Sequence, residues 1–582
     1  MPVTSSSLAR CIVGTAVAAF LAVAPIEISA QPNPSGDVPG LTAAGSYLAA
    51  RHASQMRDAV AAAEYYRDAL KHDPKNADLL NRAFLSLVIG GEIGDSVTFA
   101  ERVVRADKTD RVGRLVLGVH AIKLRHYRTA RHDLAQSIHG PITDLTATLL
   151  TAWSMAGEGQ SRGAVSKIDH LSGPDWYAIF KDLHAGMILD LAGHKKDAGK
   201  RLEQAYKLDS SALRVVEAYG SWLSRNKSPA EALKVFETFD KALPRHPLVL
   251  AAMAKLKAGK KLPPVVNSAQ AGAAEALYGL GASLGRRGGE DLGLVYLQLA
   301  LYLEPHHSLA LLSLADLFEA IKKPDLALKT YERIPANSPL HRNAAIQMAA
   351  DLDALDRPEE AKKQLEALVK KDPTDVEAIM ALGNVLRGHK EFTQCGAVYS
   401  KAIATLKNPD KSNWVMYYFR GICYERSNEW PKAEADLKEA LKLYPEQPNV
   451  LNYLGYSWVD KGLHLDEGMA MIKRAVQQRP DDGYIVDSLG WAYYKLGKYD
   501  EAVKQLQRAI ELKPEDSTIN DHLGDAYWRV GRKLEARFQW AHSRDMKPDP
   551  DELVKVLAKL KNGLPDEQSS QAKPPKKAGD GG

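Results

Sequence analysis

An internal repeat of 34 residues is the feature of this sequence that most restricts how the chain can fold. When residues 484–548 are aligned with themselves at a shift of 34, Gly490 matches Gly524 and Pro514 matches Pro548. A fixed period of this length indicates an array of small, similar units that stack on one another. A chain of 582 residues is also too long for one compact core.

Each unit is predicted to be a helical hairpin. In the unit that contains Gly490, apolar residues recur every three or four positions over 489–496, stop at a glycine, and resume over 502–510. Gly490 and Ala502 are small, which lets the two helices of the unit approach closely. Pro514 ends the second helix because proline lacks a backbone N–H and disfavours helix in the residue before it.

This combination of Leu-Gly, Tyr, Ala, Ala and Pro at fixed spacing resembles the tetratricopeptide repeat (TPR). The resemblance implies an all-α fold, a TPR solenoid of about fourteen helical hairpins that form a right-handed superhelix in two arrays. The small residue of the first helix marks each unit: Ala50, Phe84, Gly118, Ala152, Gly186 and Gly220 in the first array, and Gly281, Ala315, Ala349, Gly383, Gly421, Gly455, Gly490 and Gly524 in the second.

The repeat phase and the composition divide the chain into seven segments. They are a signal peptide (1–30), a flexible lead-in (31–42), an N-terminal TPR array of about six repeats (43–244), a linker or hinge rich in Lys, Gly and Pro (245–270), a C-terminal TPR array of about eight repeats (271–548), a capping helix (549–565) and a disordered tail (566–582). The capping helix repeats Leu553, Val556, Leu557 and Leu560 at helical spacing, and an array needs such a helix to cover its last apolar face.

The first 30 residues predict export of the chain. One cation, Arg10, precedes an apolar run from Cys11 to Ala24 that is too short to span a bilayer, and a small residue follows at Ala30. This order is typical of a cleaved secretory signal. The alternative is an uncleaved N-terminal anchor at the membrane. Cys11 lies at the start of the apolar run instead of after it, which makes lipid anchoring doubtful.

The sequence offers little for catalysis. Ser283 fits a G-x-S-x-G pattern but lies inside a predicted helix, where a nucleophile elbow cannot form. His120, His126 and His132 are six residues apart, so they do not share a helix face as metal ligands would. The net charge of +5 provides no basic stripe of the density that nucleic acid requires. We expect no enzyme activity, cofactor, metal, nucleic acid or small-molecule substrate.

Cys395 and Cys423 allow two interpretations. Cys395 occupies the close-packing position of a second helix, and Cys423 lies on the next first helix, so both are expected to be small buried residues. A disulfide between them is the alternative, since an exported protein meets an oxidising compartment.

In a TPR stack the first helices are known to line the concave face, and this rule predicts two protein-binding surfaces. The apolar N-terminal groove consists of Leu85, Val88, Leu115, Val119, Ile122, Leu149, Trp153, Phe180, Leu183 and Met187. The mixed C-terminal groove consists of Tyr418, Arg426, Asn452, Tyr456, Tyr484, Asp487, Trp491, Tyr494, Asp521, Asp525, Trp528 and Arg529. The alternative for the first groove is burial against the chain itself, and for the second it is packing between neighbouring units.

The sequence LNYLGYSWVDKG at 451–462 and the stretch that follows it are similar to exported TPR adaptors of Gram-negative bacteria. The best-known type binds a periplasmic carboxyl-terminal processing protease and helps it degrade peptidoglycan hydrolases. The resemblance therefore implies a periplasmic, non-catalytic scaffold whose partners are proteins. In its most specific form, the hypothesis names this protease and its hydrolase substrates as the partners. The alternative is a scaffold for cell-envelope assembly, such as peptidoglycan synthesis or polysaccharide export.

Overall fold

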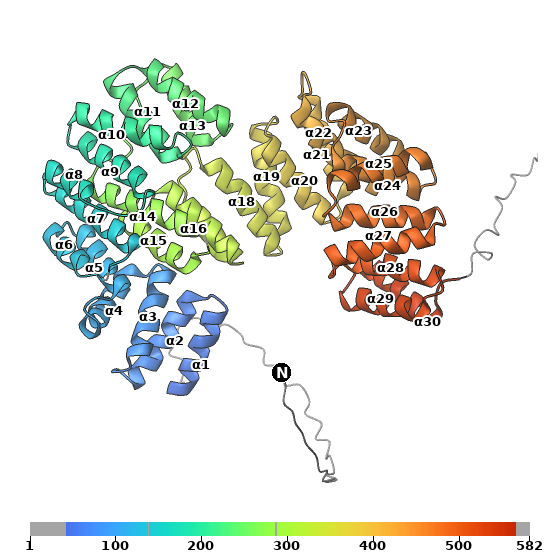
Figure 1. Ribbon diagram of the computed structural model, residues 1–582, viewed down its shortest axis with the longest axis horizontal. Helices are drawn as coiled ribbons and strands as arrows, with labels where there is room; N and C mark the ends of the chain where they lie inside the picture. The colour runs from blue at the N-terminus through green and yellow to red at the C-terminus, as the bar shows by residue number, and fades with distance from the viewer. Residues whose placement is uncertain (1–41, 138, 286–287, 566–582) are drawn as a thin grey trace, which may run out of the picture.

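A computed structural model describes residues 42–137, 139–285 and 288–565. The regular structure of these residues consists of thirty α-helices and one short 3₁₀ turn, without a β-strand (Figure 1). The prediction of an all-α solenoid is confirmed. The predicted signal peptide (1–30), the lead-in up to residue 41 and the tail (566–582) lie outside the described residues.

Within the described ranges, twenty-eight of the helices pair into fourteen hairpins, as the repeat count predicts. The first six are α1 (Ala43–Gln55) with α2 (Ala59–His72), α3 (Ala77–Gly90) with α4 (Ile93–Ala106), α5 (Arg111–Lys123) with α6 (Tyr127–Ala135), α7 (Pro141–Gly157) with α8 (Ser161–Asp169), α9 (Tyr177–Leu191) with α10 (Lys195–Leu208), and α11 (Leu213–Asn226) with α12 (Pro229–Ala242). The single helix α13 (Pro247–Lys257) follows them.

The remaining eight hairpins form the second half of the chain. They are α14 (Ala269–Gly285) with α15 (Glu290–Leu303), α16 (Ser308–Ala320) with α17 (Pro324–Tyr331), α18 (His341–Ala354) with α19 (Pro358–Lys371), α20 (Val376–Gly388) with α21 (Phe392–Ala404), α22 (Trp414–Arg426) with α23 (Trp430–Leu443), α24 (Pro448–Asp460) with α25 (Leu465–Gln478), α26 (Gly483–Lys495) with α27 (Tyr499–Leu512), and α28 (Ser517–Arg529) with α29 (Lys533–Asp545). The turn η1 (Lys411–Asn413) precedes α22, and α30 (Pro550–Asn562) ends the described chain.

Contacts inside a hairpin explain why small residues recur at a fixed period. In the hairpin of α26 and α27, Gly490 and Ala502 are both buried. A Cβ atom on Gly490 would lie 2.6 Å from Leu506 Cγ, so any larger residue would push the helices apart. Gly497, with a φ of 72°, makes the turn between the two helices in the left-handed region that suits glycine.

The segment 245–270, predicted to be a linker or hinge, forms a packed crossover. Its first part forms α13, which packs on α12. Leu262 and Val266 in the remaining part are buried, and Ser221 Oγ donates a hydrogen bond to the Pro263 carbonyl at 2.5 Å. The glycine and prolines end α13 and lead the chain across the first array. The contacts of Leu262, Val266 and Pro263 hold this segment in place.

After this crossover the chain turns back into the first array. The helix α14 packs against α7 and α9, and α15 packs against α3, α4 and α5, so the hairpin lies inside the arc of the first twelve helices (Figure 1). At the closest approach, a Cβ atom on Gly272 would lie 2.4 Å from the indole of Trp153. One apolar core extends from Ala50 to Ala344. The α14–α15 hairpin therefore fills the concave face of the first array.

Buried polar contacts hold this hairpin in place. Arg214 on α11 forms an ion pair with Glu275 on α14, and His307 Nε2 lies 2.8 Å from the same carboxylate. Burial opposes the ionisation of Glu275, but Arg214 and His307 lower the pKa of its carboxyl group to about 2. Because separating a buried, paired charge is costly, the hairpin behaves as part of the core.

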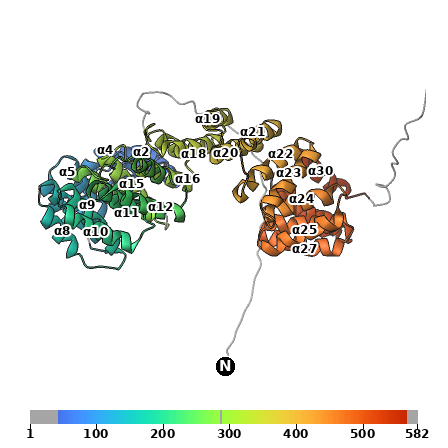
Figure 2. The same cartoon turned by 90° about the horizontal axis from the view of Figure 1, so that it is seen from above.

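A narrow stretch formed by α18, α19 and α20 joins the two large groups of helices (Figures 1 and 2). The apolar core changes at this point, since a separate cluster begins at Leu328 and continues to Cys423. From α20 onward successive hairpins stack on one another, and α30 packs on α29. The C-terminal array is thus built on cores of its own.

Candidate protein-binding groove

The predicted N-terminal groove is not an open surface. Seven of its residues are buried, namely Val88, Leu115, Val119, Ile122, Leu149, Trp153 and Met187, and the other three, Leu85, Phe180 and Leu183, are partly buried against the same core. The cause is the α14–α15 hairpin, which the repeat phase assigns to the second array but which packs back onto these side chains. The alternative weighed from the sequence, burial of this lining against the chain itself, is what the structure shows.

The residues predicted for the C-terminal groove lie on α22, α24, α26 and α28, and those in the middle of this set are aromatic. The ring of Trp491 stacks on Tyr494 and on His522, with centroid distances of 4.6 Å and 3.9 Å. His522 Nδ1 lies 3.0 Å from a carboxylate oxygen of the buried Asp487. Trp491 and Tyr494 are only partly buried. They offer a flat apolar surface whose orientation is fixed by its neighbours.

The charge of His522 depends on its neighbours. Burial disfavours the imidazolium, but Asp487 raises the pKa of His522 above its ordinary value, and Asp521 and Asp525 act in the same sense. The pair of His522 and Asp487 joins α28 to α26. The rule that assigns concave positions within each unit did not predict His522. Its spacing of 35 residues from Asp487 could have indicated the contact, because it places the two residues on matching turns of successive first helices.

A second group of polar aromatic side chains lies on α22 and α24. Tyr418 contacts Tyr453 edge-on, with ring centroids 6.0 Å apart, and burial raises the pKa of Tyr418 to about 12. Burial also raises the pKa of Tyr456, further along α24. Asn452 Nδ2 donates to Ser488 Oγ at 3.0 Å. Neutral phenols and an oriented amide can form hydrogen bonds with a chain that lies in this groove.

Two other predicted residues lie at the rim of the groove. Arg426 is exposed, with its guanidinium 5.2 Å from the ring centroid of Phe392. Tyr484 is 55% exposed, and Lys513 Nζ lies 5.5 Å from its ring centroid. Both side chains are accessible to a partner.

The far end of the groove is closed by α30. Lys559 Nζ lies 2.6 Å from Asp521 and 2.8 Å from Asp525, and all three side chains are largely buried. Asp525 also accepts a hydrogen bond of 2.9 Å from Trp540 Nε1. These two carboxylates are therefore used inside the protein and are not free to bind a partner, which corrects the prediction for both.

The last residues of the described chain cover the next two predicted positions. Arg529 donates to the Pro565 carbonyl at 2.9 Å. A Cβ atom on Gly563 would lie 2.1 Å from the indole of Trp528, so this glycine packs directly on the ring. Arg529 and Trp528 thus anchor the capping segment. Apart from these two and Asp521, the predicted groove residues that stay at least partly exposed lie on α22, α24 and α26.

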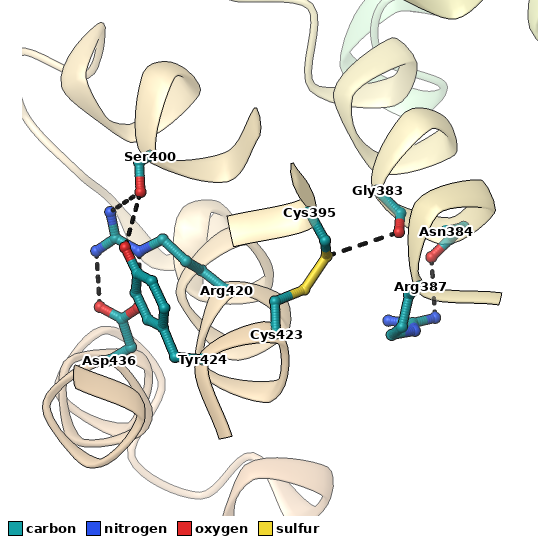
Figure 3. The surroundings of a disulfide bond; sticks show 9 residues. All are labelled: Gly383, Asn384, Arg387, Cys395, Ser400, Arg420, Cys423, Tyr424 and Asp436. Carbon is teal, nitrogen blue, oxygen red and sulfur yellow. Dashed lines mark hydrogen bonds and ion pairs between the residues drawn. A yellow bond between two sulfur atoms is a disulfide. The ribbon is translucent and has the colours of Figure 1, made fainter. Parts of the chain in front are cut away.

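The helix that carries Tyr418 is tied to the helix before it by a disulfide. Cys395 on α21 and Cys423 on α22 are bonded, with Cα atoms 6.0 Å apart, a separation typical of disulfides (Figure 3). The expectation of two separate buried thiols is wrong, although both residues are fully buried as predicted. The two positions meet because a second helix always packs against the first helix of the next unit.

Polar contacts around the disulfide fix α22 further (Figure 3). Arg420 donates two hydrogen bonds to the Asp436 carboxylate on α23, at 2.6 Å and 2.7 Å. The hydroxyl groups of Tyr424 and Ser400 lie 3.0 Å apart and join α22 to α21. A helix held on both sides presents its groove residues at a set orientation, which lowers the entropic cost of binding.

Residues considered for catalysis are used in packing. Ser283 lies within α14, and His120 Nδ1 lies 2.8 Å from the Tyr302 hydroxyl. In the described ranges, no group of three or more His, Cys, Asp or Glu side chains is placed to bind a metal ion. Nor is any helix of those ranges both long and apolar enough to cross a bilayer.

Parts of this chain are similar in sequence to known repeat proteins. A family model described as TPR repeat matches residues 490–531, and one described as tetratricopeptide repeat matches residues 416–447. The TPR repeat-containing protein PA4667 of Pseudomonas aeruginosa is 34% identical over 83 residues, which is 14% of this chain and 14% of that protein.

Three solved structures also match this chain over the shares given below. A tetratricopeptide repeat protein from Parabacteroides merdae is 14% identical and covers 43% of this chain and 98% of its own, with a TM-score of 0.38. A chain of the APC/C hetero-tetramer Cut9-Hcn1 is 13% identical and covers 89% and 96%, with a TM-score of 0.36. MamA is 21% identical and covers 29% and 95%, with a TM-score of 0.25.

Fourteen stacked hairpins with small buried residues where their helices cross define an α-helical repeat solenoid. The units that match the family models identify it further as a tetratricopeptide repeat protein. Proteins of this kind generally act as scaffolds for protein–protein interactions through their concave surfaces and are typically not catalytic.

Proposed function

We propose that this chain is an exported, non-catalytic adaptor that binds protein partners in its C-terminal groove. In the most specific form of the proposal, the partners are a periplasmic carboxyl-terminal processing protease and the cell-wall hydrolases that it degrades. One observation supports the binding role above all: Tyr484 is 55% exposed and Trp491 and Tyr494 are partly exposed, whereas seven of the ten residues of the N-terminal groove are buried. Aromatic side chains of this kind supply much of the energy of protein interfaces.

Other features of the chain support export and the identity of the partner. The first 30 residues fit a secretory signal, and a bond such as Cys395–Cys423 persists in oxidising compartments and is rare in the cytosol. The stretch that resembles exported TPR adaptors starts at residue 451. It therefore contributes α24 and α26, two of the helices that form the open groove.

The groove suits an extended or helical segment of a partner. Apolar side chains of that segment would pack on Trp491 and Tyr494, while Asn452 and the phenols of Tyr418 and Tyr456 would bond its polar groups. The Cys395–Cys423 disulfide and the contact between His522 and Asp487 already hold the helices of the groove in place. Binding of a partner therefore loses little free energy to rearrangement of the groove.

The test is degradation of a cell-wall hydrolase by the purified protease with and without this chain. The double variant Trp491→Ala/Tyr494→Ala should bind the protease at least about 30-fold more weakly, since loss of one hot-spot residue costs about 2 kcal/mol or more. The matched control is Trp176→Ala, which removes a 43% exposed indole from the first array. It should leave binding and turnover unchanged.

Two outcomes would count against the proposal. Unchanged protease binding by a folded double variant would exclude the C-terminal groove as the docking surface. Co-purification with envelope synthases, without any effect on hydrolase turnover, would support the assembly scaffold in place of the protease adaptor.

A further inference from the structure

The last helix of the described residues, α30, has no second helix paired with it there, unlike the first helix of each hairpin. Leu557 and Ala558 on α30 lie 34 residues after Leu523 and Gly524 on α28, so α30 occupies the place of the first helix of a fifteenth unit. The described chain ends at residue 565, and no second helix follows α30 within it. One face of α30 is therefore left without the helix that would normally cover it.

This uncovered face is apolar. Leu523 is 2% exposed because α29 covers it, whereas Leu557 at the same position is 46% exposed. Val554 is 68% exposed on the same helix, and Ala558, at the small-residue position, is exposed as well. The sequence predicts that α30 shields the array. That holds for Val556, which is 1% exposed, but Leu557 points outward.

The second helix of the last hairpin, α29, departs from the pattern too. Leu534 and Phe538 on α29 are 84% and 60% exposed. The preceding unit has Asp500 and Lys504 at these positions. Apolar side chains where a neighbouring repeat carries charges indicate a surface that another molecule covers.

We propose that α30 of one molecule packs against α30 of a second copy of this chain, which gives a two-fold symmetric dimer joined at its C-terminal ends. A two-fold axis that passes through the face near Leu557, perpendicular to the helix, sets the two helices antiparallel. The two helices of a hairpin are also antiparallel. Each α30 thus takes the place of the second helix that the other lacks.

Charge and sequence favour a second copy as the occupant. α30 carries the exposed Asp551 in its first turn and the exposed Lys561 in its last, so each acidic end of an antiparallel pair faces a basic end. Lys559 is held by Asp521 and Asp525 and takes no part in this contact. The tail 566–582 has no large apolar side chain with which to cover the face. α30 has 13 residues and is about 20 Å long, so the interface is small and the dimer should be weak.

Sedimentation equilibrium of the full chain between about 1 and 200 µM tests this dimer, since a small interface corresponds to micromolar dissociation. The wild type should pass from monomer to dimer over this range, and Val554→Asp should raise the dissociation constant at least tenfold. Leu48→Asp on α1, which changes a leucine that is 63% exposed at the other end, should have no effect. Ala558→Cys should form a disulfide between two copies on a non-reducing gel.

Two results would overturn the proposal. One is a wild-type chain that stays monomeric over the whole range, which would leave this face for a different partner. The other is a dimer that Val554→Asp leaves intact and in which Ala558→Cys does not cross-link, which would place the interface elsewhere on the molecule.

Discussion

Replacing Gly272 by alanine tests whether the α14–α15 hairpin is a fixed part of the first array. The added Cβ atom would lie 2.4 Å from the indole of Trp153, which is fully buried and donates its Nε1–H to His184 at 3.1 Å. Because the ring cannot shift without straining that bond, the overpacking should cost about 1–3 kcal/mol. The same change removes a glycine from a helix interior, which returns up to about 1 kcal/mol.

Gly279→Ala in the same helix separates these two effects. A Cβ atom there would meet Phe180 at 3.4 Å, an ordinary contact. Both variants gain the same helix propensity, so the difference between them isolates the contact with Trp153 and should be about 1–3 kcal/mol.

The assay is hydrogen–deuterium exchange of α7 and α14 in the full chain. The Gly272→Ala variant should exchange about 5- to 150-fold faster than the Gly279→Ala variant, because local opening follows the local free energy. Equal exchange in the two variants would refute the close packing of α14 on Trp153.

Three further predictions concern the C-terminal array. The pKa of His522 is raised above 6.5 in the folded state. The thermal stability that His522 adds relative to His522→Gln should therefore be complete below about pH 6.5 and be lost as the pH rises through the higher folded pKa. Melting curves in which the difference between the two proteins stays constant from about pH 5 to pH 9 would contradict this. Lys559→Met leaves two buried carboxylates unpaired and should destabilise α30 by about 3–5 kcal/mol, whereas Lys555→Met at an exposed ion pair should cost at most about 1 kcal/mol. Limited proteolysis of the C-terminal segment compares the two, and equal sensitivity would argue against the buried ion pair. Replacing Cys395 and Cys423 by alanine removes a bridge that spans 28 residues and should lower the stability of the array by about 2–4 kcal/mol in urea unfolding, so an unchanged midpoint would count against the disulfide.

The hairpins could be predicted from sequence because their contact residues recur at a fixed period. Gly490 and Ala502 are buried where the two helices of their unit cross, as their spacing predicts. The 34-residue repeat period does not show which concave face is covered by another hairpin of the chain. The marker Gly281 has the same phase relation to its own unit as any other, while the residue that docks α14, Gly272, carries no periodic signal. The prolines of 245–270 are equally compatible with a hinge and with a packed crossover.

The groove was predictable where position within a repeat decides which way a side chain faces. Trp491 and Tyr494 lie on the inner surface for that reason. The repeat period could not show that Lys559 forms ion pairs with Asp521 and Asp525, because these contacts depend on how α30 packs on the end of the array. Sequence spacing left both cysteine interpretations open, since it gives no distance between side chains.

Cysteine accessibility measures directly whether the first groove is filled while the second is open. Val119→Cys and Leu149→Cys would place a thiol in the N-terminal lining, where the native side chains are 0% exposed, and Tyr484→Cys and Trp491→Cys would place one in the C-terminal groove. The unchanged chain gives the background. In the native state a maleimide reagent should label the second pair and should label the first pair only after denaturation. Native labelling of Val119→Cys at the rate of Tyr484→Cys would contradict the filled first groove.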